Sequence, residues 1–185
     1  MKKATSTILA AILCFSLQAQ TKLVTNNGKA VIYSHTVAED ISAENSTVTG
    51  IIEEQSGVIA ISVPVQGFRF EKALMQEHFN NDRFMDSKKF PRISLKGKIN
   101  DLTNVNFQKD GQYEVTITGD LTIKGVTKVI TEKAHVTIKN GFASVHCKFV
   151  VKDISSYGVG KPMGGKKNNV ADDIEVTYTA AYEKE

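Results

Sequence analysis

The sequence predicts an all-β protein, made of an extended antiparallel sheet and one short α-helix, on three observations. Residues 113–123 alternate apolar and polar side chains, which is the period-two pattern of a half-buried strand. The dipeptide Asn140-Gly141 is the pair preferred in a two-residue hairpin turn of type I′. Residues 70–79 carry apolar side chains at helical spacing and interrupt the series of strands. A strand of about eleven residues exceeds the usual five or six, so the sheet is expected to be long and curved.

The first nineteen residues have the features of a secretory signal peptide. Two lysines precede an apolar run from Ile8 to Leu17, and Ala19 is a small residue at the expected cleavage point. The run is too short for a transmembrane helix. We therefore expect residues 1–19 to be removed near Ala19, a periplasmic or secreted protein, and a single domain over residues 20–185.

The net charge and the cysteine content limit which partners and which stabilising interactions are expected. Removing the leader takes two of the 23 basic side chains and leaves 21 against 20 acidic ones, a formal net charge of +1. Bulk charge therefore does not point to a nucleic-acid partner. Cys147 is the one cysteine that remains, which excludes an intramolecular disulfide and makes core packing the source of stability.

Turn residues separate strand patterns along the whole mature chain. The turns are Gln55-Ser56-Gly57, Lys124-Gly125 and Asn140-Gly141. In addition to the hairpin around Asn140-Gly141, we predict strands at residues 29–36, 46–53, 58–65, 92–99, 113–123 and 173–182.

The Asn140-Gly141 turn fixes which residues face each other in its hairpin. Lys139 pairs with Phe142, and this register collects apolar side chains on one face and polar ones on the other. We interpret the apolar face as inward. Cys147 lies on it and is read as a buried small side chain with no chemical role.

Metal and catalytic sites are not predicted. The register brings His135 opposite His146, but a structural zinc site needs four protein ligands and a catalytic one three, and no third ligand stands at a diagnostic spacing. The chain has no G-x-S-x-G motif, and the carboxylates of Asp172-Asp173 would point to opposite faces of a strand. An isomerase or hydrolase with scattered groups inside the fold remains an open alternative.

The segment 68–91 interrupts the strands and is expected to cover or plug the sheet. Its apolar positions 70, 73, 74 and 78 share one helical face if His78 packs inward. Four phenylalanines and two methionines lie in or just after the helix, and Pro91 requires an extended approach to the next strand.

Three motifs in this order resemble those of the YceI-like family. They are the segment Leu74-Met-Gln-Glu-His-Phe79 with Phe84-Met-Asp-Ser and Phe90-Pro91, the segment Gly119-Asp-Leu-Thr-Ile-Lys-Gly-Val-Thr-Lys128, and Tyr157-Gly158-Val159. The resemblance covers residues 29–185. It implies a lipocalin-like, extended, eight-stranded antiparallel β-barrel covered by a helix, whose apolar tunnel binds a polyisoprenoid or a similar lipid. Periplasmic export is typical of the family. The chain departs from the common family pattern at Glu71-Lys72, where many members carry Arg-Asp, and in a longer basic glycine loop at 160–169.

A barrel of eight strands has enough interior for one small ligand, which supports a binding protein independently of the family. Small inward residues are expected to leave volume for that ligand: Gly97, Gly119, Ala134 and Ala143. The residues predicted to line the apolar cavity and its lid are Phe68, Phe70, Leu74, Met75, Phe79, Phe84, Met85, Phe90, Ile93, Leu95, Tyr113, Ile117, Leu121, Ile123, Val145 and Phe149.

The basic loop gives a second hypothesis, in which Lys161, Lys166 and Lys167 attract a diphosphate head group at the cavity mouth. A solvated loop is the alternative. A nucleotide-binding P-loop is rejected, because position 167 is Lys where that motif needs Ser or Thr.

The expected function is therefore that of an exported, non-enzymatic binder that transports, stores or sequesters a long-chain isoprenoid or other lipid. An exported interaction or stress protein with a closed core is the alternative. No cofactor is expected unless the bound lipid is itself a quinone. Transient contact with a membrane is expected, and the protein is either a monomer or a dimer.

Overall fold

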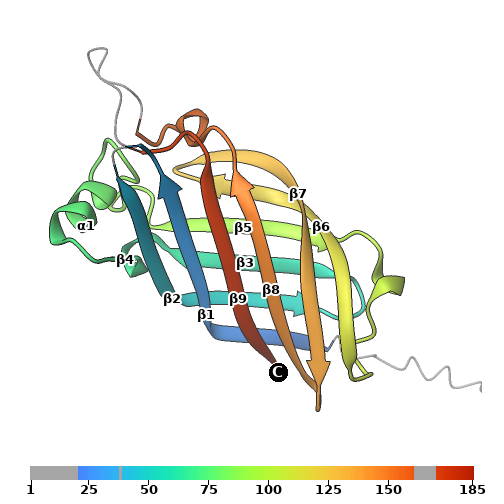
Figure 1. The fold of residues 1–185 in the computed structure, drawn as a ribbon. Helices are drawn as coiled ribbons and strands as arrows, with labels where there is room; N and C mark the ends of the chain where they lie inside the picture. Colours follow the sequence, from blue (N-terminus) through green and yellow to red (C-terminus); the bar gives the residue numbers. More distant parts are fainter. Residues whose placement is uncertain (1–20, 38, 161–169) are drawn as a thin grey trace, which may run out of the picture.

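The computed structural model describes residues 21–37, 39–160 and 170–185 (Figure 1). Over these residues the chain is mainly β, with one α-helix and three short 3-10 turns. The elements are β1 (Lys22–His35), β2 (Asp40–Glu53), β3 (Val58–Pro64), η1 (Val65–Gly67), β4 (Arg69–Phe70), α1 (Ala73–Asn80), β5 (Arg92–Ile99), η2 (Leu102–Asn104), β6 (Gly111–Ile123), β7 (Val126–Lys139), β8 (Phe142–Val151), η3 (Ile154–Tyr157) and β9 (Ile174–Lys184).

The sheet closes on itself as a barrel. Its strand order is β1-β9-β8-β7-β6-β5-β3-β2, and β2 pairs again with β1. The eight strands in this ring are antiparallel to their neighbours, and the two-residue β4 adds to the edge of β2. The predicted all-β class, the closed eight-stranded antiparallel barrel and the single short helix are confirmed.

Two tight hairpins set the register of the β6–β7–β8 wall. Asn140 and Gly141 both have positive φ, 52° and 81°, as a type I′ turn requires. Lys139 pairs with Phe142, as predicted. The β6–β7 turn has the same form, with φ values of 48° at Lys124 and 78° at Gly125.

Strand β1 is longer than the alternation of its side chains indicated. The prediction started this strand at residue 29, whereas it starts at Lys22. Its pairing with β2 shifts register between Thr25 and Gly28 and again between Gly28 and Ala30. A bulge of this kind inserts unpaired residues and breaks the period of two without ending the strand. The pairing partner β2 is likewise longer and starts at Asp40.

The expectation that small inward residues leave cavity volume is wrong. Gly97 and Gly119 face each other across β5 and β6, and a Cβ on Gly97 would lie 2.5 Å from the carbonyl oxygen of Thr118. These glycines let two strand backbones approach closely. Ala134 and Ala143 are 0% and 1% exposed, belong to the core cluster, and do not line the cavity.

The two ends of the barrel differ in packing. At the end opposite α1, the β5–β6 connection contributes the buried Val105 and Phe107 to the core (Figure 1). At the other end, α1 and η3 lie beside the barrel opening. No helix within the described ranges is both long and apolar enough to cross a membrane.

Candidate ligand-binding cavity

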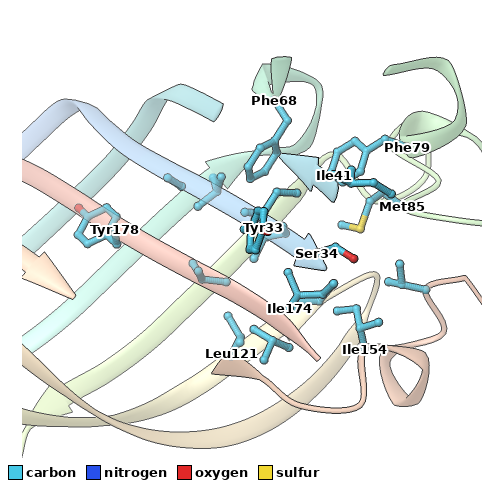
Figure 2. A pocket seen from close by; sticks show the side chains of 18 of the residues that line it. Tyr33, Ser34, Ile41, Phe68, Phe79, Met85, Leu121, Ile154, Ile174 and Tyr178 are labelled. Atoms are coloured by element: carbon cyan, nitrogen blue, oxygen red, sulfur yellow. The ribbon is translucent and has the colours of Figure 1, made fainter. Parts of the chain in front are cut away.

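The barrel encloses an apolar cavity of about 790 Å³ at the end covered by α1 (Figure 2). Ligand pockets generally fall within about 300–1,000 Å³. Leu74, Lys72 and His78 are exposed to solvent and also line the cavity, so they mark its mouth. The cavity therefore runs from the surface beside α1 into the barrel.

Alternate residues of the strands form the walls. Because side chains of a strand point to its two faces in turn, each strand contributes every second residue to the interior. In β8, for example, Val145, Cys147, Phe149 and Val151 line the cavity while Lys148 points out and forms an ion pair with Glu175. In β6, Ile117, Leu121 and Ile123 point into the barrel and line the cavity.

Aromatic packing fastens α1 to the barrel. The Phe79 ring lies 5.4 Å from that of Phe68 in an edge-on arrangement and 4.9 Å from that of Phe70. Phe68 is 2% exposed and belongs to the barrel core. An ion pair of 2.5 Å joins Lys72, just before the helix, to Glu39 in the β1–β2 connection. The lid is therefore held by an apolar cluster and one surface charge pair.

The face predicted for this helix is only partly right. The prediction required His78 to pack inward, but His78 and Leu74 are exposed and line only the cavity mouth, Ala73 is exposed outside the lining, and Met75 and Phe79 are the half-buried apolar residues. The helix starts at Ala73 because Phe70 belongs to β4, where it pairs with Ala43. Because the prediction counted residue 70 as part of the helix, it assigned the apolar face partly to the wrong side of α1.

Two tyrosines form the far end of the cavity. Figure 2 shows Tyr178 at the opposite end of the cavity from Phe79 and Met85. The hydroxyl groups of Tyr178 and Tyr182 are hydrogen-bonded at 2.8 Å, and both residues are buried. Burial raises the pKa of Tyr182 to about 12 and also raises that of Tyr178. The inner end of the cavity is therefore uncharged at neutral pH.

Most of the predicted lining residues meet around this one cavity. Fourteen of the sixteen line it: Phe68, Phe70, Leu74, Met75, Phe79, Phe84, Met85, Ile93, Leu95, Ile117, Leu121, Ile123, Val145 and Phe149.

Phe90 and Tyr113 lie outside the lining. Phe90 packs against the β6–β7 turn, where a Cβ on Gly125 would lie 2.7 Å from its ring. Tyr113 has the inward parity of β6 but stands near its other end, with its hydroxyl donating to the Lys109 carbonyl at 2.9 Å. Parity predicts the face of a residue and not its depth in the barrel, which explains the error at Tyr113.

The sequence-based prediction missed lining residues on β1, β2, β9 and the β8–β9 connection. They include Ala30, Ile32, Ile41, Ile154, Val159, Ile174, Val176 and Tyr178. The alternation in β9 could have identified Ile174, Val176 and Tyr178. The residues in the connection carry no periodic signal.

Other predicted groups lie away from the cavity or outside the described part. Lys161, Lys166 and Lys167 lie outside the described residues. His135 and His146 face each other on the outer wall, as the register predicted. Among the residues that the structure describes, no three His, Cys, Asp or Glu side chains are close enough to hold a metal ion.

Cys147 is expected to react slowly with thiol reagents in the folded protein. Burial raises the pKa of its thiol to about 11, with a smaller contribution from Glu132, and its Sγ donates to the Lys133 carbonyl at 3.2 Å. Only about 0.1% of such a thiol is thiolate at pH 8, so iodoacetamide should modify it at least about a hundredfold more slowly than free cysteine. Mass spectrometry of the peptide that contains Cys147 measures this rate.

The same pKa shift gives the sign of a pH effect on stability. Because the folded-state pKa of Cys147 is raised, this contribution to stability is present below about pH 9 and is lost as pH rises toward 11.

In the iodoacetamide experiment, protein unfolded in urea is the control, and its Cys147 should react at the rate of free cysteine. Equal rates for folded and unfolded protein would contradict the burial of this thiol.

Comparison with known proteins identifies the family. A model of the YceI-like domain matches residues 16–182. The chain belongs to the YceI-like family. A UPF0312 protein of Shewanella denitrificans is 26% identical over 129 residues, which are 65% of this chain and 62% of that protein. The match thus spans somewhat less than two thirds of this relative's length.

Solved structures support the YceI-like fold. A polyisoprenoid-binding domain from Saccharophagus degradans, implicated in plant cell wall breakdown, superposes with a TM-score of 0.75 at 11% identity, covering 90% of this chain and all of that one. BcnA of Burkholderia cenocepacia gives a TM-score of 0.69 at 15% identity, covering 83% and 95%. The YCEI protein of Campylobacter jejuni gives 0.61 at 19% identity, covering 82% and 90%. At these identities the likeness concerns the fold.

Proposed function

We propose that this YceI-like protein binds one long apolar ligand, a polyisoprenoid or a similar lipid, inside the barrel and transports, stores or sequesters it. The observation that carries this proposal is the apolar cavity of about 790 Å³, which reaches the surface beside α1. The polyisoprenoid-binding domain of Saccharophagus degradans, which has a similar fold, supports the same class of ligand.

The energetics suit a lipid. Burying hydrocarbon contributes about 0.8 kcal/mol per methylene group. Micromolar affinity corresponds to about 8 kcal/mol, so a few five-carbon isoprene units supply it even after the costs of association. The cavity argues against the alternative of an interaction protein whose core is packed shut.

We propose binding rather than catalysis. Titratable side chains in the lining lie mainly at the mouth, where Glu39 and Lys72 neutralise each other. Inside the barrel, the raised pKa values of Cys147 and the tyrosine pair keep these groups neutral and favour an inert wall.

We also propose export to the periplasm or the cell exterior, because residues 1–19 resemble a signal peptide. The assignment of residues 20–185 to one domain depends on the same leader. Lys161, Lys166 and Lys167 are proposed to attract a polar head group, and transient contact of the mouth with a membrane would load the ligand. Monomer and dimer are both compatible with the proposal.

The decisive experiment is extraction of the purified protein with organic solvent, followed by mass spectrometry. We expect a lipid in stoichiometric amount, and an increase in melting temperature when an isoprenoid is added to delipidated protein. Absence of any lipid, together with an unchanged melting temperature, would overturn the proposal.

A further inference from the structure

Arg83 stands at the cavity mouth on a backbone that is fixed from two sides. It lies between α1 and β5, and its carbonyl accepts from the Gly160 backbone N–H at 3.0 Å and from Lys124 Nζ at 3.4 Å. The same Lys124 Nζ donates to the carbonyls of Asp82 and Gly158, at 2.7 Å and 2.9 Å. These bonds tie the Arg83 segment to the β6–β7 turn and to the β8–β9 connection.

The side chain of Arg83 lines the cavity and lacks a polar partner within the described ranges of the chain. Its Nε is buried without a hydrogen bond, and its guanidinium lies 5.8 Å from the ring centre of Phe84. None of the ion pairs between described residues includes it. A guanidinium carries five N–H donors, and a buried donor without an acceptor destabilises the protein.

Three other cations near this end of the barrel are already engaged. Lys72 pairs with Glu39 at 2.5 Å, and Arg69 donates to the Gln66 carbonyl at 2.6 Å. Arg92 donates to Ser62 Oγ at 3.0 Å. Because Glu39 already pairs with Lys72, Arg83 is a positive charge without a carboxylate partner, among the described residues, at the mouth of a mainly apolar cavity.

We infer that Arg83 binds the anionic head group of the ligand, so that the ligand is an acidic single-chain lipid with a phosphate or carboxylate end. This inference rests on the proposed function and specifies its class of ligand. Arginine is suited to the role, because its planar fork of donors matches two oxygens of a phosphate or carboxylate. The apolar chain then occupies the barrel while the charge stays at the mouth.

The test compares ligands that share a chain and differ in their head group. Geranylgeraniol, geranylgeranyl monophosphate and geranylgeranoic acid, the carboxylate probe, are titrated into delipidated protein by calorimetry, with inorganic phosphate as the probe that lacks a chain. Wild-type protein is expected to bind the monophosphate about tenfold more tightly than the alcohol, since hydrogen bonds to charged groups are among the strong ones. Inorganic phosphate is expected to show no binding at millimolar concentration.

Arg83→Gln should remove most of the preference for the monophosphate and leave affinity for the alcohol within about twofold. Arg83→Lys keeps the charge and should retain part of the preference. Arg92→Gln is the matched control, because it deletes a positive charge at the same end of the barrel, outside the lining, and should change neither affinity.

Each contrary outcome has its own meaning. Equal binding of alcohol and monophosphate by the wild type, or an Arg83→Gln variant that melts earlier but keeps its preference, would overturn the inference and leave lipid binding intact. Binding of inorganic phosphate alone would show an anion site independent of any lipid and would also overturn it. If the wild-type protein binds none of the ligands that carry an apolar chain, the proposed function is overturned, and the inference with it.

Discussion

Replacing Ala30 with Phe is expected to shorten the cavity, so that long isoprenoids bind at least about a hundredfold more weakly while short ones bind as before. Ala30 is 5% exposed, lines the cavity and pairs across β1 and β9 with Tyr178, which stands at the inner end. A benzyl group there would fill the inner part of the cavity. Exclusion of one five-carbon unit forfeits about 4 kcal/mol at about 0.8 kcal/mol per methylene.

The measurement is a series of dissociation constants for prenyl chains of ten to thirty carbons. For the wild-type protein, affinity should increase with chain length until the cavity is full, and for Ala30→Phe it should level off sooner. Ala181→Phe, on the outward face of β9, is the matched control and should follow the wild-type curve. A uniform loss across all lengths would contradict the position of Ala30 at the inner end.

Replacing Phe79 with Ala is expected to release the lid and speed up the exchange of ligand. The Phe79 ring makes the aromatic contacts with Phe68 and Phe70 that fasten α1 to the barrel. Truncation of a fully buried Phe costs about 3–5 kcal/mol, and because Phe79 is half-buried we expect a loss of about 2 kcal/mol in the free energy of unfolding. The dissociation rate of a bound isoprenoid should rise by about tenfold or more, since the closed position of the helix loses most of its apolar support.

Chemical denaturation and stopped-flow displacement of a fluorescent isoprenoid measure these two effects. Glu77→Ala changes an exposed residue of the same helix outside the lining and should leave both quantities unchanged. Phe79→Leu should fall between wild type and Phe79→Ala. If Phe79→Ala lowers stability without any change in the dissociation rate, α1 supports the barrel but does not gate the cavity.

Local signals were sufficient to predict the wall from β6 to β8. Asn140-Gly141 needs positive φ at both positions, so it specified the turn and, with it, the pairing of Lys139 with Phe142. The alternation in residues 113–123 then placed Ile117, Leu121 and Ile123 inside, because a strand cannot change parity without a bulge.

Features that depend on distant residues were beyond the sequence. The bulge near Gly28 concealed the start of β1, since its extra residues break the alternation that marks a strand. Gly97 and Gly119 suggested empty space, but their role is visible only once β5 and β6 face each other. Arg83 lies in an aperiodic connection, and a charged side chain was not expected in an apolar lining, although its neighbours Phe84 and Met85 were predicted to line the cavity.

Closure of the ring by β1 gives folding and ligand binding a common step. β1 is hydrogen-bonded to β2, its neighbour along the chain, and to β9, at the other end of the described chain. Pairings between such distant segments form late, because much of the entropy of the chain must be lost first. The cavity wall that contains Ala30 and Tyr178 does not exist until β9 docks. A lipid held inside would therefore stabilise the pairing of β1 with β9. Loss of the lipid would make this pairing the first to separate when the barrel opens.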